Sequence, residues 1–220
     1  MRASHVLCLA LFAMALLVYS CSDDPASPPT TTCNWVEQYP SPTENTLFGV
    51  SFTDADNGTA VGSLGTIIHT TDGGEIWRSQ TSGTDYTLKG VCFTDANTGT
   101  VVGNGGTILR TTNGGASWVK QTSGTMLGLT SVSFTHPDTG TVVGNGGTIL
   151  RTTDGGTTWV SQTSGTDAPL YDVSFVDANT GCAVGDEDTI LRTTDGGATW
   201  ISQPSFEGNF LFGVSFTHAN

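Results

Sequence analysis

Short apolar runs separated by polar turn residues dominate the chain from residue 34 onward. The runs are rich in Val, Ile, Phe, Thr and Trp and are bounded by Gly, Asn, Asp and Ser, which is typical of β-strands. No stretch within this part has the spacing of an amphipathic helix. In one representative stretch the pattern predicts strands at residues 129–135, 140–144, 148–152 and 159–163. The sequence therefore predicts an all-β chain.

This four-strand pattern recurs at a fixed interval. Tryptophans occupy positions 77, 118, 159 and 200, and each is 41 residues from the next. A period of about 40 to 45 residues without helices is the signature of a β-propeller with one four-stranded blade per repeat. We expect the propeller in residues 34–220, with blades near 47–82, 88–123, 129–164 and 170–205 and a partial blade at 211–220.

The two ends of the repeat region resemble parts of blades. Residues 35–38 match the outer-strand phrase at 77–80, although no earlier strands of that blade precede them, and residues 211–217 repeat 47–53 letter for letter. The interpretation is four complete blades plus the first strand of a fifth, in a fragment of a longer ring. A four-bladed ring with an extra terminal strand is the alternative.

Each tryptophan ends the phrase S/T-x-D-x-G-x-x-W, the Asp-box. The acidic or amide side chain can accept backbone N–H bonds across a tight turn, the glycine supplies a positive φ, and the indole anchors the turn. We interpret this motif as structural. Its acidic or amide positions and tryptophans are Asp72, Trp77, Asn113, Trp118, Asp154, Trp159, Asp195 and Trp200.

The N-terminus has the features of an export signal. Residues 1–20 begin with Met and Arg and continue into an apolar stretch too short to span a bilayer comfortably. The box Val18-Tyr19-Ser20-Cys21 predicts lipidation of Cys21, and an ordinary secretory signal is the alternative. Residues 21–33 then form a Ser/Pro/Thr-rich tether. We expect an exported protein, lipid-anchored to a bacterial membrane on its periplasmic side or at the cell surface.

Charge and motif content exclude several functions. The chain has 7 basic and 20 acidic residues, a net charge of −13, which argues against binding to nucleic acid. The acidic run at residues 186–188 could hold a cation, but contiguous carboxylates on a hairpin are more often solvated. There is no phosphate-binding glycine loop, no His/Cys metal spacing and no Ser/His/Asp arrangement. We therefore predict no cofactor, no metal and no catalytic residues.

A set of basic residues recurs before the Asp-box, at the end of the third strand of each blade: His69, Arg110, Arg151 and Arg192. Two roles are open for them. They could pair with nearby carboxylates or cap carbonyls within the blades. They could instead form a basic arc that binds an acidic segment of a protein partner.

Asp-box repeats also occur in sialidases, so a carbohydrate-binding or sialidase-like glycosidase propeller is the alternative function. Such an enzyme needs clustered arginines, a tyrosine nucleophile and a general acid. After the signal, the arginines are Arg78, Arg110, Arg151 and Arg192, and three of these share one repeat position. The sequence therefore favours a protein that is not an enzyme.

The full repeat resembles the photosystem II stability/assembly factor family of BNR-repeat propellers. The phrases that carry the resemblance are residues 90–95, 99–103 and 106–115 followed by Trp118, and it extends over residues 35–220. The resemblance implies a ring of about seven blades and a non-enzymatic, in some members lipid-anchored, assembly chaperone. We predict a monomeric, non-catalytic scaffold for a protein partner, with a membrane complex among the candidates.

Overall fold

Each repeat of the sequence forms one four-stranded antiparallel sheet in the computed structural model, which describes residues 17–18, 36–37, 42–205 and 208–216. Strands β1 (Leu17–Val18) and β2 (Val36–Glu37) pair with each other. The rest of the predicted signal, Cys21 and the tether lie outside the described residues.

Within each blade the strands follow one another from the inner to the outer edge of the sheet. The sixteen blade strands are β3 (Leu47–Phe52), β4 (Gly58–Gly62), β5 (Ile67–Thr70) and β6 (Arg78–Gln80) in blade 1; β7 (Leu88–Phe93), β8 (Gly99–Gly103), β9 (Thr107–Thr111) and β10 (Val119–Gln121) in blade 2; β11 (Leu129–His136), β12 (Thr139–Gly144), β13 (Ile149–Thr152) and β14 (Val160–Gln162) in blade 3; and β15 (Leu170–Phe175), β16 (Gly181–Gly185), β17 (Ile190–Thr193) and β18 (Ile201–Ser202) in blade 4.

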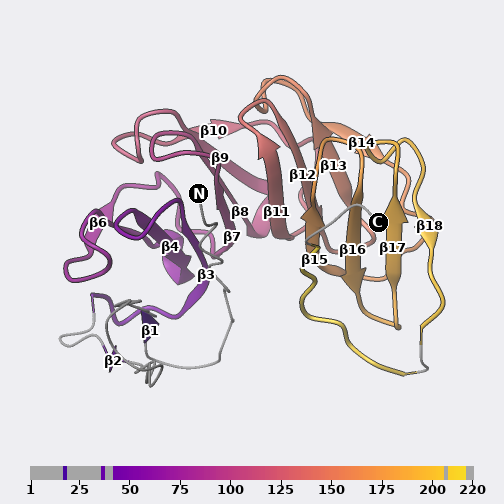
Figure 1. Ribbon diagram of the computed structural model, residues 1–220, viewed down its shortest axis with the longest axis horizontal. Coiled ribbons are helices and arrows are strands. Elements are labelled where there is room, and N and C mark those ends of the chain that lie inside the picture. Colours follow the sequence, from indigo (N-terminus) through magenta and orange to yellow (C-terminus); the bar gives the residue numbers. More distant parts are fainter. Residues whose placement is uncertain (1–16, 19–35, 38–41, 206–207, 217–220) are drawn as a thin grey trace, which may run out of the picture.

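The blades stand side by side along an open arc (Figure 1). The inner strands β3, β7, β11 and β15 lie toward the middle of the arc, and consecutive inner strands are in contact. The outer strands β6, β10, β14 and β18 lie at its periphery (Figure 1). The prediction of an all-β chain with four propeller blades is confirmed. In the third blade the first two strands extend one residue beyond the predicted bounds, and the last two are shorter.

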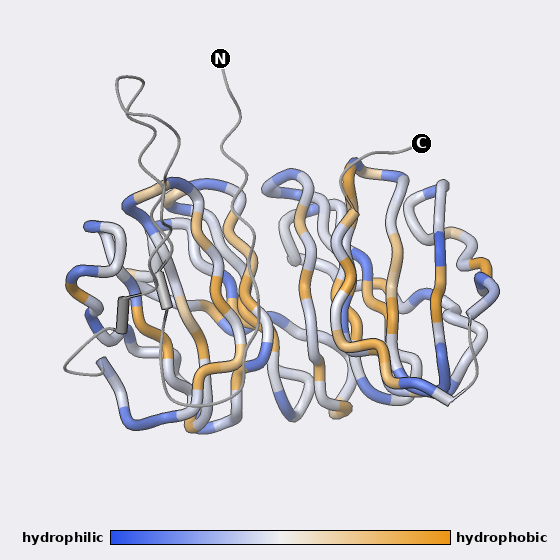
Figure 2. The backbone as a smooth tube through the Cα atoms, turned by 60° about the horizontal axis from the view of Figure 1, so that its bottom comes forward, coloured by the Kyte–Doolittle hydropathy of each residue, from blue (hydrophilic) through white to orange (hydrophobic). Residues whose placement is uncertain are grey.

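The core consists of apolar layers between neighbouring blades. Between blades 1 and 2, Val61 and Ile67 pack with Leu88, Val101 and Leu109, all at most 2% exposed. Equivalent clusters fill the next two interfaces. The hydropathy of the backbone follows this arrangement, with apolar segments in the strands and polar segments at the turns (Figure 2). Because each blade buries residues of both faces, its second strand is apolar without alternation.

Residues 211–216 take the position of an inner strand beside blade 4. The backbone N–H of Phe216 donates to Ser174 Oγ at 3.1 Å. The same bond joins consecutive inner strands elsewhere, from Phe93 to Ser51 and from Phe175 to Ser133. The segment is not paired with a second strand in the described part of the chain. This placement matches the predicted first strand of a further blade.

The antiparallel order gives the arc two different rims. The hairpin rim carries the turns between the second and third strands (residues 63–65, 104–106, 145–147 and 186–188) and the loops between blades (81–87, 122–128 and 163–169). The Asp-box rim carries the turns after the first strands and the Asp-boxes themselves. A hydrogen bond from Gly73 N to Asp56 O, 2.9 Å long, joins these two kinds of turn.

Candidate partner-binding surface

The Asp-box satisfies its polar groups within its own turn. In blade 3, Thr152 Oγ1 donates to Asp154 Oδ1 and accepts from Gly156 N, at 2.9 and 2.8 Å. Thr158 donates to Asp154 through both its backbone N–H (2.9 Å) and its hydroxyl (2.6 Å). These bonds stabilise the carboxylate and hold the pKa of Asp154 below its ordinary value. In blade 4 the same bonds, chiefly from a threonine side chain, lower the pKa of Asp195 to about 2.

The Asp-box tryptophan also ties its blade to the preceding one. Trp159 Nε1 donates to Gln121 Oε1 at 3.1 Å, and Gln121 Nε2 donates to Gly155 O at 3.0 Å. The Trp159 indole packs in an edge-to-face arrangement against the ring of Phe134, which belongs to the same blade. Two other interfaces have the same Trp–Gln bond, Trp118 to Gln80 and Trp200 to Gln162. These glutamines were not predicted from the sequence, although they recur at the same period as the tryptophans.

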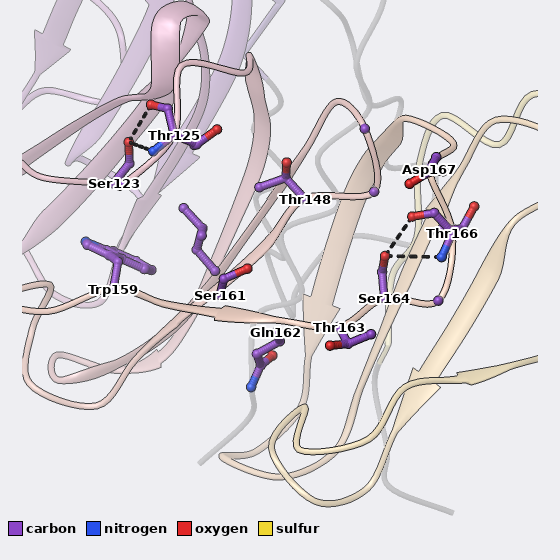
Figure 3. Close-up of a pocket in the computed structure, with 15 residues that line it drawn as sticks. Ser123, Thr125, Thr148, Trp159, Ser161, Gln162, Thr163, Ser164, Thr166 and Asp167 are labelled. Atoms are coloured by element: carbon purple, nitrogen blue, oxygen red, sulfur yellow. Dashed lines mark hydrogen bonds between the residues drawn. The ribbon is translucent and has the colours of Figure 1, made fainter.

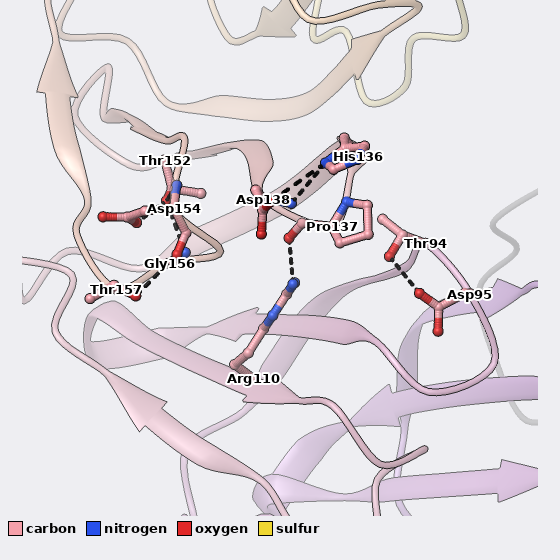
Figure 4. A network of polar contacts seen from close by, with 10 residues as sticks. All are labelled: Thr94, Asp95, Arg110, His136, Pro137, Asp138, Thr152, Asp154, Gly156 and Thr157. Atoms are coloured by element: carbon pink, nitrogen blue, oxygen red, sulfur yellow. Dashed lines mark hydrogen bonds and ion pairs between the residues drawn. The ribbon is translucent and has the colours of Figure 1, made fainter.

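Two of the predicted partner-binding arginines are buried between blades. Arg110 is 8% exposed; it donates to Thr100 Oγ1 at 2.7 Å and to Pro137 O of the next blade (Figure 4). Its guanidinium carbon lies 4.9 Å from the centre of the Phe134 ring. Arg151, 9% exposed, makes the same contacts one blade later. Burial lowers the pKa of both guanidinium groups.

The other two members of the predicted arc are half-buried. His69 Nδ1 lies 2.9 Å from Thr59 Oγ1, and burial lowers the pKa of His69. Arg192 lies opposite Cys182, which replaces the threonine found in the other blades. The four side chains thus stand on separate strands, one per blade, and do not form a shared exposed patch. This geometry favours their structural role, and a role in binding a partner stays a prediction.

The hairpin rim exposes large apolar side chains over the first three blades. Leu64 is 68% exposed, Tyr86 48%, Met126 77% and Leu127 48%. Tyr86 lies over Gly105 in the hairpin of the next blade, and Leu127 lies over Gly146 in the same way. These positions differ from blade to blade, so the apolar residues are not required by the repeat. They were not predicted from the sequence, although they stand out in loops otherwise made of Ser, Gly, Thr and Asp.

Shallow grooves of about 580 Å³ lie beside this rim. One groove is lined by Trp159, Ser161 and Thr163 along the outer strand of blade 3, and by the loop that carries Ser164 (Figure 3). The second groove is formed by equivalent residues one blade earlier and ends at Met126. The residues that line the two grooves are rich in hydroxyl groups and glycines. Asp167 is the one residue among them that carries a carboxylate.

No other chemical centre stands out in the part of the chain that the structure describes. Within it, no three His, Cys, Asp or Glu side chains lie close enough together to hold a metal ion. In the acidic run, the Asp188 carboxylate accepts the backbone N–H groups of Gly208 and Asn209. No helix among the described residues is both long and apolar enough to cross a membrane.

Comparison with known proteins gives one family match. The family model described as photosynthesis system II assembly factor YCF48 matches residues 28–127. No curated protein matches.

Solved structures similar to this chain include two of YCF48. A YCF48 bound to D1 peptide is 25% identical, with a TM-score of 0.64, over 78% of this chain and 57% of its own. YCF48 from Cyanidioschyzon merolae is 19% identical, with a TM-score of 0.52, over 82% of this chain and 92% of its own. The chain therefore spans little more than half the length of the D1-bound protein.

An ancestral GH74 enzyme is also similar, at 18% identity and a TM-score of 0.59, over 77% of this chain and 27% of its own. At that identity the likeness shows the propeller fold alone. The family match and the YCF48 structures agree with each other and with the repeat phrases of the sequence. The resemblance of this chain to the photosystem II stability/assembly factor family of BNR-repeat propellers is therefore confirmed.

Proposed function

We propose that this chain is an exported, non-catalytic propeller scaffold that captures a segment of a protein partner along its hairpin rim. The observation that carries the proposal is the row of exposed apolar side chains Leu64, Tyr86, Met126 and Leu127. Apolar groups of this size lose contact with water when a partner covers them, which is the main source of affinity at protein interfaces. The grooves beside them provide hydroxyl groups for polar contacts.

Similarity to a YCF48 bound to D1 peptide supports a protein as the partner. A peptide from a membrane protein would reach the propeller readily if Cys21 carried a lipid, because the anchor would hold the scaffold at the membrane surface. The anchor is tested by labelling with radioactive palmitate. We expect label in the full chain and none in Cys21→Ser, and label in both would contradict lipidation at this residue.

The grooves support a binding function over a hydrolytic one. Glycoside hydrolysis commonly uses two carboxyl groups on opposite sides of the scissile bond. Among the residues that line the two grooves, Asp167 carries the one carboxyl group. The arginines that a sialidase would gather around its substrate are instead held in separate blade interfaces, as Arg110 and Arg151 show.

The binding proposal is tested with fluorescent D1 peptide and the full chain, by anisotropy. We expect Tyr86→Ala and Met126→Ala each to weaken binding by about tenfold, the effect of removing a well-placed contact residue. Val119→Ala is the matched control, because Val119 is 65% exposed on β10 at the outer edge of blade 2. Equal effects of all three variants would contradict binding along the hairpin rim.

The same preparations are tested for hydrolysis of xyloglucan and of sialosides. Absence of turnover together with binding of the peptide is the expected result. Turnover above that of a heat-unfolded sample would contradict the non-catalytic part of the proposal, and it would favour the glycosidase alternative.

A further inference from the structure

The loops between blades hold their exposed residues in one repeated way. In the loop at residues 81–87, Ser82 Oγ donates to Thr84 O at 3.1 Å, and Thr84 Oγ1 accepts the backbone N–H of Tyr86 at 3.2 Å. The loops at 122–128 and 163–169 repeat both bonds, at 2.9 to 3.1 Å. Three consecutive loops therefore present the two residues after the threonine in the same position, one blade apart.

The presented residues change between acidic and apolar along the rim. They are Asp85 and Tyr86 in the first loop, Met126 and Leu127 in the second, and Asp167 and Ala168 in the third. Asp85, Met126 and Asp167 share one position of the repeat, and all three side chains are exposed. The most exposed apolar residue of the rim thus has a carboxylate one blade away on each side.

These two carboxylates are not used by the fold. Neither Asp85 nor Asp167 has a side-chain hydrogen bond or an ion pair within the described residues. The turns of the Asp-box rim differ, since Asp95 accepts the backbone N–H groups of Asn97 and Thr98 at 2.8 and 3.0 Å. The carboxylates of the loops are therefore open to the cationic groups of a partner.

The charges of the whole hairpin rim have one sign. Its loops and hairpins contain no lysine or arginine, and their acidic residues are Asp85, Asp167, Asp186, Glu187 and Asp188. Lys89 and Lys120 lie outside them, on β7 and β10. Because unlike charges attract and like charges repel across an interface, this rim favours a segment with basic side chains over one with acidic side chains.

The stacking of the blades sets the spacing of such a segment. Sheets packed face to face lie about 10 Å apart. An extended chain covers that distance in about three residues. A segment that crosses the three loops therefore places a side chain over each loop at about every third residue.

We propose that the partner segment is an extended peptide with an apolar residue over Met126 and a lysine or arginine about three residues away on each side, over Asp85 and Asp167. This inference rests on the proposed binding along the hairpin rim and adds the chemistry of the partner. The charge of this segment is opposite to that of the acidic segment considered for the basic arc.

Synthetic peptides and the full chain test the proposal by fluorescence anisotropy at low salt. Three peptides share one sequence with a central leucine, and the third residues before and after it are lysine, glutamine or glutamate. Each exposed ion pair contributes about threefold, so we expect the lysine peptide to bind about tenfold more tightly than the glutamine peptide. The glutamate peptide is expected to bind most weakly, and added salt should reduce all these differences.

Variants of the chain locate the charge preference. Asp85→Asn and Asp167→Asn are each expected to weaken binding of the lysine peptide about threefold without changing that of the glutamine peptide. Glu75→Gln is the matched control, because it removes the same charge from an exposed position on the Asp-box rim, and it should change neither. A peptide with both lysines on one side of the leucine is expected to lose about threefold, because one of them reaches no carboxylate.

D1 peptide in the same assay separates this inference from the proposed function. If Tyr86→Ala and Met126→Ala weaken its binding, binding along the rim stands. Equal affinities for the lysine and glutamine peptides, or equal losses with Asp85→Asn and Glu75→Gln, would then overturn the basic segment alone. Preference for the glutamate peptide would overturn it too and would favour the basic arc. Binding of D1 peptide that is insensitive to both alanine variants would overturn the proposed function together with this inference.

Discussion

The two rims of the arc are built from the same repeat and are suited to different tasks. On the Asp-box rim the Asp-box carboxylates and amide are bonded within their own turns, as in Asp154 and Thr158. Arg110 and Arg151 each reach across to the next blade. On the hairpin rim the residues at equivalent repeat positions differ, and Leu127 takes the place in one loop that Tyr86 has in the preceding loop. Polar groups that already have hydrogen-bond partners within the protein contribute little to binding a ligand. Exposed apolar side chains contribute binding free energy when a partner removes them from water. The first rim therefore contributes to stability, and the second is the one that we propose for binding.

The largest expected effect is at the Asp-box end of a strand. A Cβ added at Gly140 would lie 2.5 Å from the ring of Phe134. We expect Gly140→Ala to destabilise the protein by about 3 kcal/mol, because the ring is packed and cannot move without strain. Urea denaturation measures the change.

The matched control is Gly124→Ala in a loop of the hairpin rim. Nothing lies within 4 Å of its added Cβ, and its φ is +76°. We expect a cost of about 1 kcal/mol, from the backbone conformation alone. Equal costs at both glycines would contradict the distinction in packing between the two rims.

The next effect distinguishes stability from binding at the buried arginines. Arg110→Met removes the bonds to Thr100 and Pro137, and we expect a loss of about 2 kcal/mol. Arg78→Met, at an exposed position of β6, is expected to change stability by less than about 0.5 kcal/mol. Peptide binding by folded Arg110→Met should equal that of the parent chain. Weakened binding with unchanged stability would instead support the basic arc.

The smallest effect is a dependence on pH at the Asp-box rim. The pKa of Asp195 is about 2 in the folded chain, below the ordinary value of 3.8. Because the folded pKa is depressed, the stabilisation is present above pH 3.8 and is lost as the pH falls toward 2. Asp195→Asn, which copies the amide found naturally at Asn113, should reduce the loss of stability between pH 4 and pH 2. An unchanged acid profile in urea would contradict this account.

The sequence predicted the blades because their cause is local. Turn glycines, short apolar runs and the fixed interval between tryptophans are all visible in the printed chain, so the strands of the third blade were placed to within one or two residues. Pairing between blades is not local. Trp159 and Gln121 are 38 residues apart, and only the stacking of the blades brings them together.

The candidate site was harder to predict for the same reason. Arg110, Arg151 and Arg192 recur at one position, and the sequence left open whether that position faces solvent or a neighbouring blade. Pro137 O, which accepts from Arg110, is 27 residues away in the next blade. The apolar side chains of the hairpin rim were overlooked because scattered exposed apolar residues are common. They become informative once Tyr86, Met126 and Leu127 are found on one rim.

Hydrogen exchange of the full chain with and without D1 peptide tests the division between the rims most directly. The account predicts slower exchange in the loops at residues 81–87 and 122–128 when the peptide is bound, with no change in the Asp-box at residues 152–158. Protection of the Asp-boxes with unchanged exchange in the hairpin-rim loops would contradict it.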